Sequence, residues 1–290
     1  MSRTYQIITE LGSGGSGTAY MAWHKRLRKY VVIKVVKNNS ARKIEVRRNE
    51  VEALKNIKNV FIPQVLDFIT EDDNSFTILE YIEGESFDKL LHPAHGFTES
   101  QITKWYTQLA SALEAIHMLD VCHRDIKPSN IILTIKGDVC LIDFNSALVS
   151  GNITGVTSRS MGYASPEQYE YFKLCKNRVE DSYKASYAYL ETVMKTGDCK
   201  TVPTSAETIA NRHLPEKIDW KRSDIYSLGA TMLHFLTGKR PSVRTDEISR
   251  ISQIEGYSKA LLKIIESSMK RNPYERFASA KALIDALQIP

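Results

Sequence analysis

The sequence predicts an α+β protein with two lobes, a small β-rich lobe followed by a larger, mainly helical lobe. Three observations support this prediction. Short runs of β-favouring residues fill the first third, apolar residues recur at helical spacing in the remainder, and Glu83-Gly84 separates the two regions. We therefore expect one lobe over residues 1–83 and the other over residues 84–290.

In the first lobe, runs rich in β-branched and aromatic residues predict strands. These runs are Thr4–Thr9, Thr18–Trp23, Tyr30–Val36 and Phe76–Tyr81. The intervening segment 40–59 is charged, with Ile44, Val51, Leu54 and Ile57 at helical spacing, so we expect one helix there.

In the second lobe, Thr98 and Gln101 form a capping-box pattern ahead of a helix. Its apolar face is predicted from residues that repeat every three or four positions, namely Ile102, Tyr106, Leu109, Leu113 and Ile116. Two short strands, Ile131–Ile135 and Val139–Ile142, are expected around a Lys-Gly-Asp turn. Later helices are expected over Asp224–Thr237 and Lys259–Lys270.

The composition is that of a folded globular chain: 290 residues, 42% hydrophobic and 25% charged, with a formal net charge of +5. This excludes disordered and fibrous proteins, and the diffuse charge gives no support for nucleic-acid binding. No apolar run is long enough for a membrane span, and no secretory signal precedes the first strand, so a cytoplasmic location is expected. The four cysteines form no CxxC pair, so we expect reduced thiols and no zinc site.

A glycine-rich segment, Gly12-Ser13-Gly14-Gly15-Ser16-Gly17, matches the pattern GxGxxG. A dinucleotide site with this pattern requires a helix directly afterwards, whereas Thr18–Trp23 is predicted to be a strand. A strand–loop–strand hairpin could instead cover a triphosphate, because glycine lets the backbone approach closely. An ordinary flexible hairpin is the alternative.

Lys34 is expected to end the strand Val31–Lys34, and Glu50 follows sixteen positions later on the expected helix. A glutamate could orient this lysine toward phosphate oxygens. On its own, a lysine at the end of an apolar run is often only a solvated side chain.

The segment His123-Arg124-Asp125-Ile126-Lys127-Pro128-Ser129-Asn130 places polar residues directly before a predicted strand, and Asp143 follows the next strand. Asp125 offers a carboxylate to a hydroxyl proton, and Lys127 offers positive charge. Asn130 and Asp143 offer oxygen ligands for a metal. Phosphoryl transfer requires these groups, because it depends on alignment, charge neutralisation and a proton acceptor.

Together, GxGxxG, Val-Val-Ile-Lys, HRDIKPSN and Asp143-Phe144 resemble the protein kinase signature set. The stretches IEGESFDKLL, GYASPEQY and SDIYSLGATMLHFLTGKRP resemble bacterial eukaryotic-like serine/threonine kinases, and the likeness covers Tyr5 to Leu287. The resemblance implies a bilobal kinase fold, with an antiparallel β-rich N-lobe carrying one helix and a helical C-lobe. It also implies ATP, Mg²⁺ (or Mn²⁺ in its place) and transfer to serine or threonine of a protein substrate.

By this resemblance, Asp125 is the catalytic carboxylate, Lys127 neutralises the transferring phosphoryl, and Asn130 and Asp143 hold the metal. Lys34, paired with Glu50, contacts the phosphates. Leu79 would be the gatekeeper of the adenine pocket. The residues expected around the nucleotide are Gly12, Gly14, Gly17, Ala19, Val32, Lys34, Leu79, Glu80, Ile82, Ser86 and Ile132.

The resemblance also implies three supporting residues: Glu167 should pair with Arg276, and Asp224 should brace the catalytic loop. Ser160 is expected to face that loop. Candidate phosphorylation sites are Thr154, Thr157 and Ser158, although the same loop could be merely mobile. Ser129 stands where some kinases carry an acidic residue that attracts basic substrates, so the sequence argues for no basic preference.

Three features depart from the family pattern. Asn145 and Arg159 replace glycines, which keeps open the alternative of a pseudokinase scaffold that binds nucleotide or a partner without catalysis. Ala19 stands where the family usually has valine, and Val32 stands where it usually has alanine. The two side chains over the adenine therefore exchange sizes, which should keep the pocket filled. The segment 171–218 is longer than expected and is predicted to hold an extra helix, either packed on its own lobe or used for docking or dimerisation. A small-molecule phosphotransferase is disfavoured, because such enzymes usually lack the three supporting residues.

Overall fold

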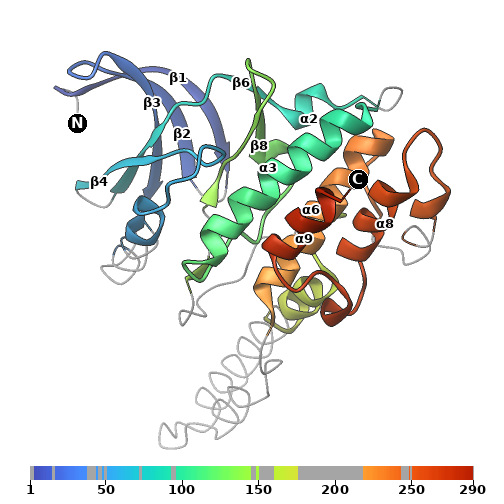
Figure 1. Ribbon diagram of the computed structural model, residues 1–290. Helices are drawn as coiled ribbons and strands as arrows, with labels where there is room; N and C mark the ends of the chain where they lie inside the picture. The colour runs from blue at the N-terminus through green and yellow to red at the C-terminus, as the bar shows by residue number, and fades with distance from the viewer. Residues whose placement is uncertain are drawn as a thin grey trace, which may run out of the picture.

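The computed structural model describes residues 3–14, 17–37, 44, 48, 51–71, 74–92, 96–144, 148–149, 160–175, 218–242, 248 and 250–289. A β-rich lobe and a helical lobe lie side by side (Figure 1), which confirms the predicted two-lobed α+β architecture. Of the expected helix at 40–59, residues 44, 48 and 51–55 are described as helical.

A five-stranded antiparallel sheet forms the first lobe, in the order β1-β2-β3-β5-β4. Its strands are β1 (Tyr5–Gly14), β2 (Gly17–His24), β3 (Lys29–Lys37), β4 (Val65–Glu71) and β5 (Asn74–Glu80). Strand β4 was not predicted from the sequence, because Asp67 and Thr70 interrupt its apolar residues. The expectation that a strand ends at Lys34 is wrong, because β3 continues to Lys37 and pairs with β5 along its whole length.

The two faces of β3 have different surroundings, because successive side chains of a strand point to opposite sides. Val31 and Ile33 are fully buried in a small core with Tyr5, Ala22 and Ile78. The alternate residues of the strand therefore face the other way, and that side lines the cavity described below.

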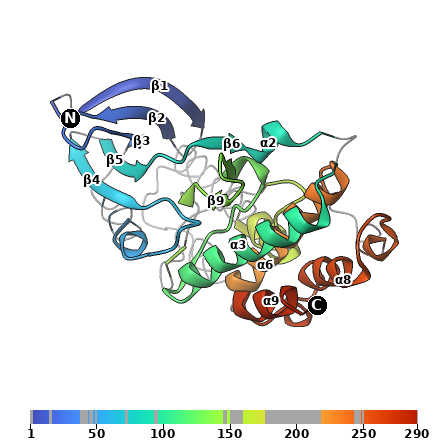
Figure 2. The same cartoon turned by 45° about the horizontal axis from the view of Figure 1, so that its top comes forward.

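Helix α3 (Glu99–His117) begins at the predicted capping box. The Thr98 hydroxyl accepts a hydrogen bond from the Gln101 backbone N–H, and the Gln101 side chain accepts one from the Thr98 N–H. All five residues of the predicted apolar face are fully buried. Figure 2 shows this helix crossing the second lobe beside α6 and α9.

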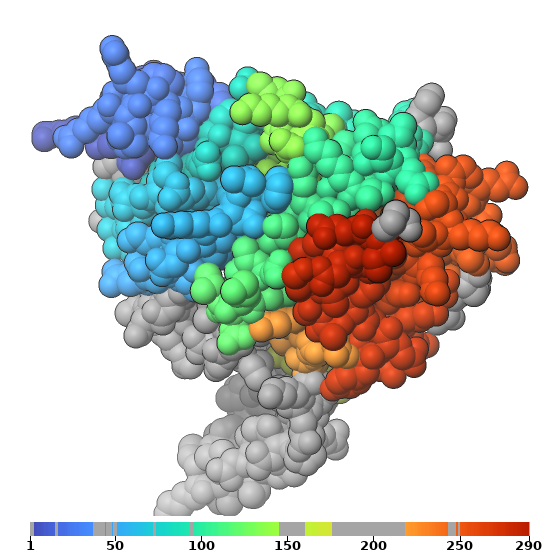
Figure 3. Space-filling view, viewed as in Figure 1, coloured from blue at the N-terminus to red at the C-terminus, as the bar shows by residue number. Residues whose placement is uncertain are grey.

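Helix α6 (Trp220–Thr237) is buried on nearly all sides, which makes it the central helix of the second lobe. It begins four residues before the predicted start and ends at Gly238, whose φ of 64° closes the helix in the left-handed conformation. Helices α8 (Lys259–Ser268) and α9 (Ala280–Leu287) pack against this core. In the space-filling view the C-terminal residues lie against the green residues of α3 (Figure 3).

Short elements of the second lobe, some of them facing the first lobe, position the polar loops. They are β6 (Gly84–Ser86), α2 (Phe87–Leu90), β7 (Val121–Cys122), η1 (Pro128–Asn130), β8 (Ile131–Thr134), β9 (Val139–Leu141) and β10 (Leu148–Val149). β8 and β9 correspond to the predicted strand pair. In the predicted insert 171–218, residues up to 175 continue a helix, and 176–217 lie outside the described residues. None of the helices that the structure describes is both long and apolar enough to cross a membrane.

Candidate active site

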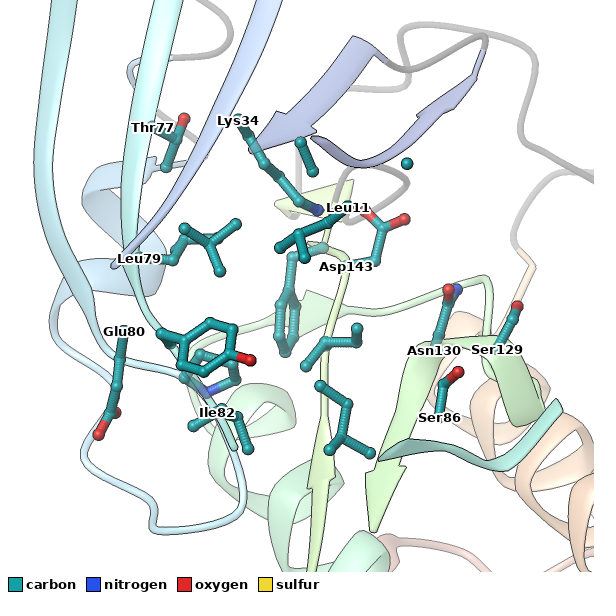
Figure 4. A pocket seen from close by; sticks show the side chains of 18 of the residues that line it. Leu11, Lys34, Thr77, Leu79, Glu80, Ile82, Ser86, Ser129, Asn130 and Asp143 are labelled. Atoms are coloured by element: carbon teal, nitrogen blue, oxygen red, sulfur yellow. Dashed lines mark hydrogen bonds and ion pairs between the residues drawn. The ribbon is translucent and has the colours of Figure 1, made fainter. Parts of the chain in front are cut away.

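A cavity of about 590 Å³ lies between the lobes, large enough for a nucleotide. Its roof includes Ala19, Val32 and the glycines where β1 ends and β2 begins, and its floor includes Ile132. The structure places every residue expected around the nucleotide on its lining: Gly12, Gly14, Gly17, Ala19, Val32, Lys34, Leu79, Glu80, Ile82, Ser86 and Ile132. Figure 4 shows side chains from both lobes facing this space.

The lining also contains residues that sequence reasoning did not single out. Leu11 and Thr18 flank the glycine loop, and Thr77 lies opposite Lys34 across the β3–β5 ladder. Tyr81 lies in the segment that connects the lobes. Leu11 could have been found from its position directly before the glycines, because its side chain is half exposed and still faces the cavity. No local signal identifies Thr77, since its place depends on strand pairing.

Lys34 and Asp143 meet across the cavity. The Lys34 Nζ lies 2.7 Å from Asp143 Oδ1, with both side chains partly buried (Figure 4). Lys34 comes from the middle of β3, and Asp143 follows β9 with a φ of 69°. A positive φ is uncommon for a residue other than glycine and concentrates at functional sites. Glu50, the expected partner of Lys34, lies outside the described residues.

Three donors hold the carboxylate of Asp125. Ser160 donates through Oγ to Asp125 Oδ1 at 2.6 Å, and Lys127 Nζ donates to Oδ2 at 2.8 Å. Asn130 donates through Nδ2 to Oδ2 at 3.1 Å and to the Asp125 carbonyl at 2.7 Å. Lys127 also donates to Ser160 at 3.1 Å, so these four residues form one network. Asn130 lines the cavity, which places Asp125 at its edge.

Asp224 holds the backbone of the loop that carries Asp125. Its carboxylate is fully buried and accepts backbone N–H bonds from His123 and Arg124, both at 2.8 Å. His117 lies 2.9 Å from the same carboxylate. Arg124 has a φ of 63°, an unfavourable conformation that these bonds stabilise. The expected bracing role of Asp224 is confirmed.

His123 is fully buried beneath the site. Its Nε2 lies 3.1 Å from the Ile142 carbonyl, which can only accept, and its Nδ1 accepts from the Asp125 N–H at 3.3 Å. This is the pattern of a neutral imidazole. Burial, the largest effect, lowers the pKa of His123 below its ordinary value, although the Asp224 charge opposes the shift.

Arg276 and Glu167 form the expected pair. Two guanidinium nitrogens donate to the two carboxylate oxygens at 2.6 and 2.9 Å, and the Arg276 side chain is fully buried. The guanidinium also donates to three backbone carbonyls, those of Lys270, Arg271 and Arg222. This bidentate pair ties the helix at 166–175 to the C-terminal part of the lobe.

Several predicted positions lie outside the described residues. They are Glu50, Asn145, Thr154, Thr157, Ser158 and Arg159. The other candidate site residues are described and lie around one cavity and its edge.

Comparison with protein-family models identifies residues 5–181 as a protein kinase domain, which is more than half of the chain. The chain belongs to the protein kinase family. In this kinase domain the cavity, the Lys34–Asp143 pair and the Asp125 network occupy the cleft between the lobes.

Curated relatives of this kinase domain include a probable serine/threonine-protein kinase of Clostridium perfringens, 29% identical over 227 residues, covering 75% of this chain and 32% of the relative. A probable serine/threonine-protein kinase of Clostridium acetobutylicum is 25% identical over 311 residues, covering 99% of this chain and 40% of the relative. Serine/threonine-protein kinase ULK3 of Homo sapiens is 37% identical over 147 residues, covering 49% of this chain and 31% of the relative. The chain thus spans less than half the length of these relatives.

Proposed function

We propose that this chain is an ATP-dependent protein serine/threonine kinase. The observation that carries the proposal is the convergence of Lys34, Asp143, Asn130 and Asp125 at one cavity between the lobes. The glycine-containing roof and this polar floor suit a polyphosphate flanked by a purine pocket. The relatives named as serine/threonine kinases support the same conclusion.

Asp125 is the group proposed to accept the proton of the substrate hydroxyl. Its carboxylate is already oriented by Ser160, Lys127 and Asn130, so little reorganisation is needed when the hydroxyl arrives. Lys127, beside it, would neutralise charge on the transferring phosphoryl group. Lys34 would hold the phosphates from the opposite lobe.

Asn130 and Asp143 fit a magnesium ion, because both offer hard oxygen ligands at the cavity wall. The Asn130 amide nitrogen is engaged by Asp125, which leaves the amide oxygen for a cation. When bound, magnesium (or manganese) supplies positive charge that neutralises the phosphate oxygens. Ala19, Val32 and Ile132 would enclose the adenine, and the backbone of Glu80 and Ile82 would hydrogen-bond it.

Incubation with radiolabelled ATP, magnesium and a generic serine/threonine substrate tests the proposal. Transfer of label to the substrate by the wild type, with at least a hundredfold loss in Asp125→Asn, is the expected result. Label transfer that survives Asp125→Asn would indicate contamination, and nucleotide binding without transfer would favour the pseudokinase alternative. The departures that raised this alternative, Asn145 and Arg159, lie outside the described residues.

A docking or dimerisation role for the segment 171–218 is also a proposal, supported by its length in the sequence. Its deletion should leave activity on a generic substrate intact and impair activity on a native one. Equal loss on both substrates would favour a purely structural role. Cytoplasmic location likewise stays a prediction of the sequence.

A further inference from the structure

An exposed arginine, Arg240, packs on a tyrosine ring near the Asp125–Ser160 network. Arg240 follows α6, and its guanidinium carbon lies 5.6 Å from the centre of the Tyr163 ring, a cation–π arrangement. The Tyr163 ring is buried, and its hydroxyl lies 2.6 Å from His234 Nδ1. Among the residues that the structure describes, no carboxylate forms an ion pair with Arg240.

The turn that supports Arg240 is the one that carries Ser160. Tyr163 donates its backbone N–H to the Ser160 carbonyl at 3.0 Å, while the Ser160 hydroxyl contacts Asp125. Gly162, with a φ of +86°, lets this turn lie directly on residues 240–241. A Cβ there would be 2.2 Å from the Pro241 carbonyl oxygen and 3.3 Å from Arg240 Cγ. Arg240 therefore packs on the same turn whose Ser160 hydroxyl contacts Asp125, the residue proposed to meet the acceptor hydroxyl.

The charge of this cluster comes from Arg240. Burial, the largest effect, lowers the pKa of His234, so its ring is neutral near pH 7 and adds no positive charge. Burial likewise raises the pKa of Tyr163, which keeps its hydroxyl protonated. An arginine already stacked on a ring loses little side-chain freedom on binding, and its planar fork matches carboxylate and phosphate oxygens.

A carboxylate of opposite charge also lies near this turn among the described residues. Asp88 of α2 contributes, less than burial, to raising the pKa of Tyr163, and it lines the cavity. The neighbouring Lys89 is paired with Glu85 at 2.8 Å. Ser129 of the catalytic segment, which lines the cavity, carries no charge. Among the residues that the structure describes, Arg240 and Asp88 are two opposing charges near this turn.

We propose that Arg240 selects substrates carrying an acidic or phosphorylated residue a few positions from the acceptor hydroxyl. This inference rests on the proposed kinase function and names its substrate class. Arg240 is favoured over Asp88 as the selecting group because it lies directly on the turn that contacts Asp125. An acidic side chain would find a preformed partner there, whereas a basic one would be repelled by the Arg240 guanidinium.

Matched acceptor peptides test the proposal. Glutamate, arginine, alanine or phosphoserine is placed in turn at each position near a single acceptor serine, and kcat/KM is measured for each peptide. The wild type should prefer the glutamate peptide over the arginine peptide by about tenfold or more at one position, with phosphoserine at least as good as glutamate. Arg240→Gln should abolish this ratio and Arg240→Glu should invert it. Because the ratio is taken within each variant, partial loss of folded protein cancels.

Two further variants serve as controls. Lys239→Gln removes the neighbouring exposed cation and should leave the ratio unchanged, while Asp88→Asn should increase it. Equal use of glutamate and arginine peptides by the wild type, or an unchanged ratio in Arg240→Gln, would overturn the inference and leave the kinase function standing. If no peptide is phosphorylated, including the alanine one, both the proposed function and this inference are overturned.

Discussion

Lys34 Nζ lies 2.7 Å from Asp143 Oδ1, although 109 positions separate the two residues. One residue belongs to the sheet of the first lobe and the other to the loop after β9 of the second. Their contact joins the lobes at the cavity where a triphosphate and its metal are proposed to bind.

Lys34→Met should reduce phosphoryl transfer by about a hundredfold to a thousandfold, because one positive charge is lost from the phosphate site. The side chain is partly exposed, so the folded state should survive. Steady-state kinetics measure the loss, and thermal melting checks the fold. Activity within tenfold of the wild type would contradict the proposed phosphate contact.

Ser160→Ala should lower kcat by about tenfold to a hundredfold, since it removes a hydrogen bond to the Asp125 carboxylate. Ser160→Thr retains the hydroxyl and should keep most of the activity. If the alanine and threonine variants lose activity equally, the hydroxyl is not what orients Asp125.

Glu167→Ala should lower the free energy of unfolding by about 3–5 kcal/mol, because it leaves the buried Arg276 guanidinium without its counter-charge. Glu167→Gln keeps an acceptor for the guanidinium and should cost less. Urea denaturation of both variants measures the difference. A loss below about 1 kcal/mol in the alanine variant would show that the backbone carbonyls suffice to hold Arg276.

Stability should fall as the pH drops below about 6.5, the ordinary pKa of histidine. Burial lowers the pKa of His123 in the folded state. As the pH falls, the unfolded chain therefore binds a proton at this histidine before the folded chain does, and this shifts the equilibrium toward the unfolded state. This loss continues until the pH reaches the folded-state pKa and then levels off. Urea unfolding between pH 7.5 and 5, compared with His123→Asn, isolates the contribution. A pH profile identical in both proteins would refute it.

Cys122 and Cys140 should resist alkylation in the folded protein. Both are buried, and burial raises the pKa of Cys140 to about 12 and that of Cys122 well above its usual value. The partly exposed Cys175 should react faster. Iodoacetamide labelling at pH 8 with peptide mapping, before and after denaturation, measures the three rates. Labelling of Cys140 at the rate of Cys175 would contradict its burial.

The sequence by itself determined the features that are local. The capping box and apolar period of α3, the β8–β9 pair and the residue types of the catalytic segment each lie within a short stretch, so periodicity and spacing were sufficient. The inventory of chemical groups and the two-lobed order were likewise predictable, since they need no knowledge of which elements pair.

Tertiary structure alone decided what depends on pairing and packing between elements. β4 has weak local periodicity and is a strand because β5 supplies its hydrogen-bond partners, and β3 extends past Lys34 for the same reason. The placement of Thr77 in the cavity and of Arg240 on Tyr163 follows from contacts between elements far apart in the chain. Such contacts form only when the elements of a lobe pack together, because local backbone preferences are too weak to specify which remote side chains meet.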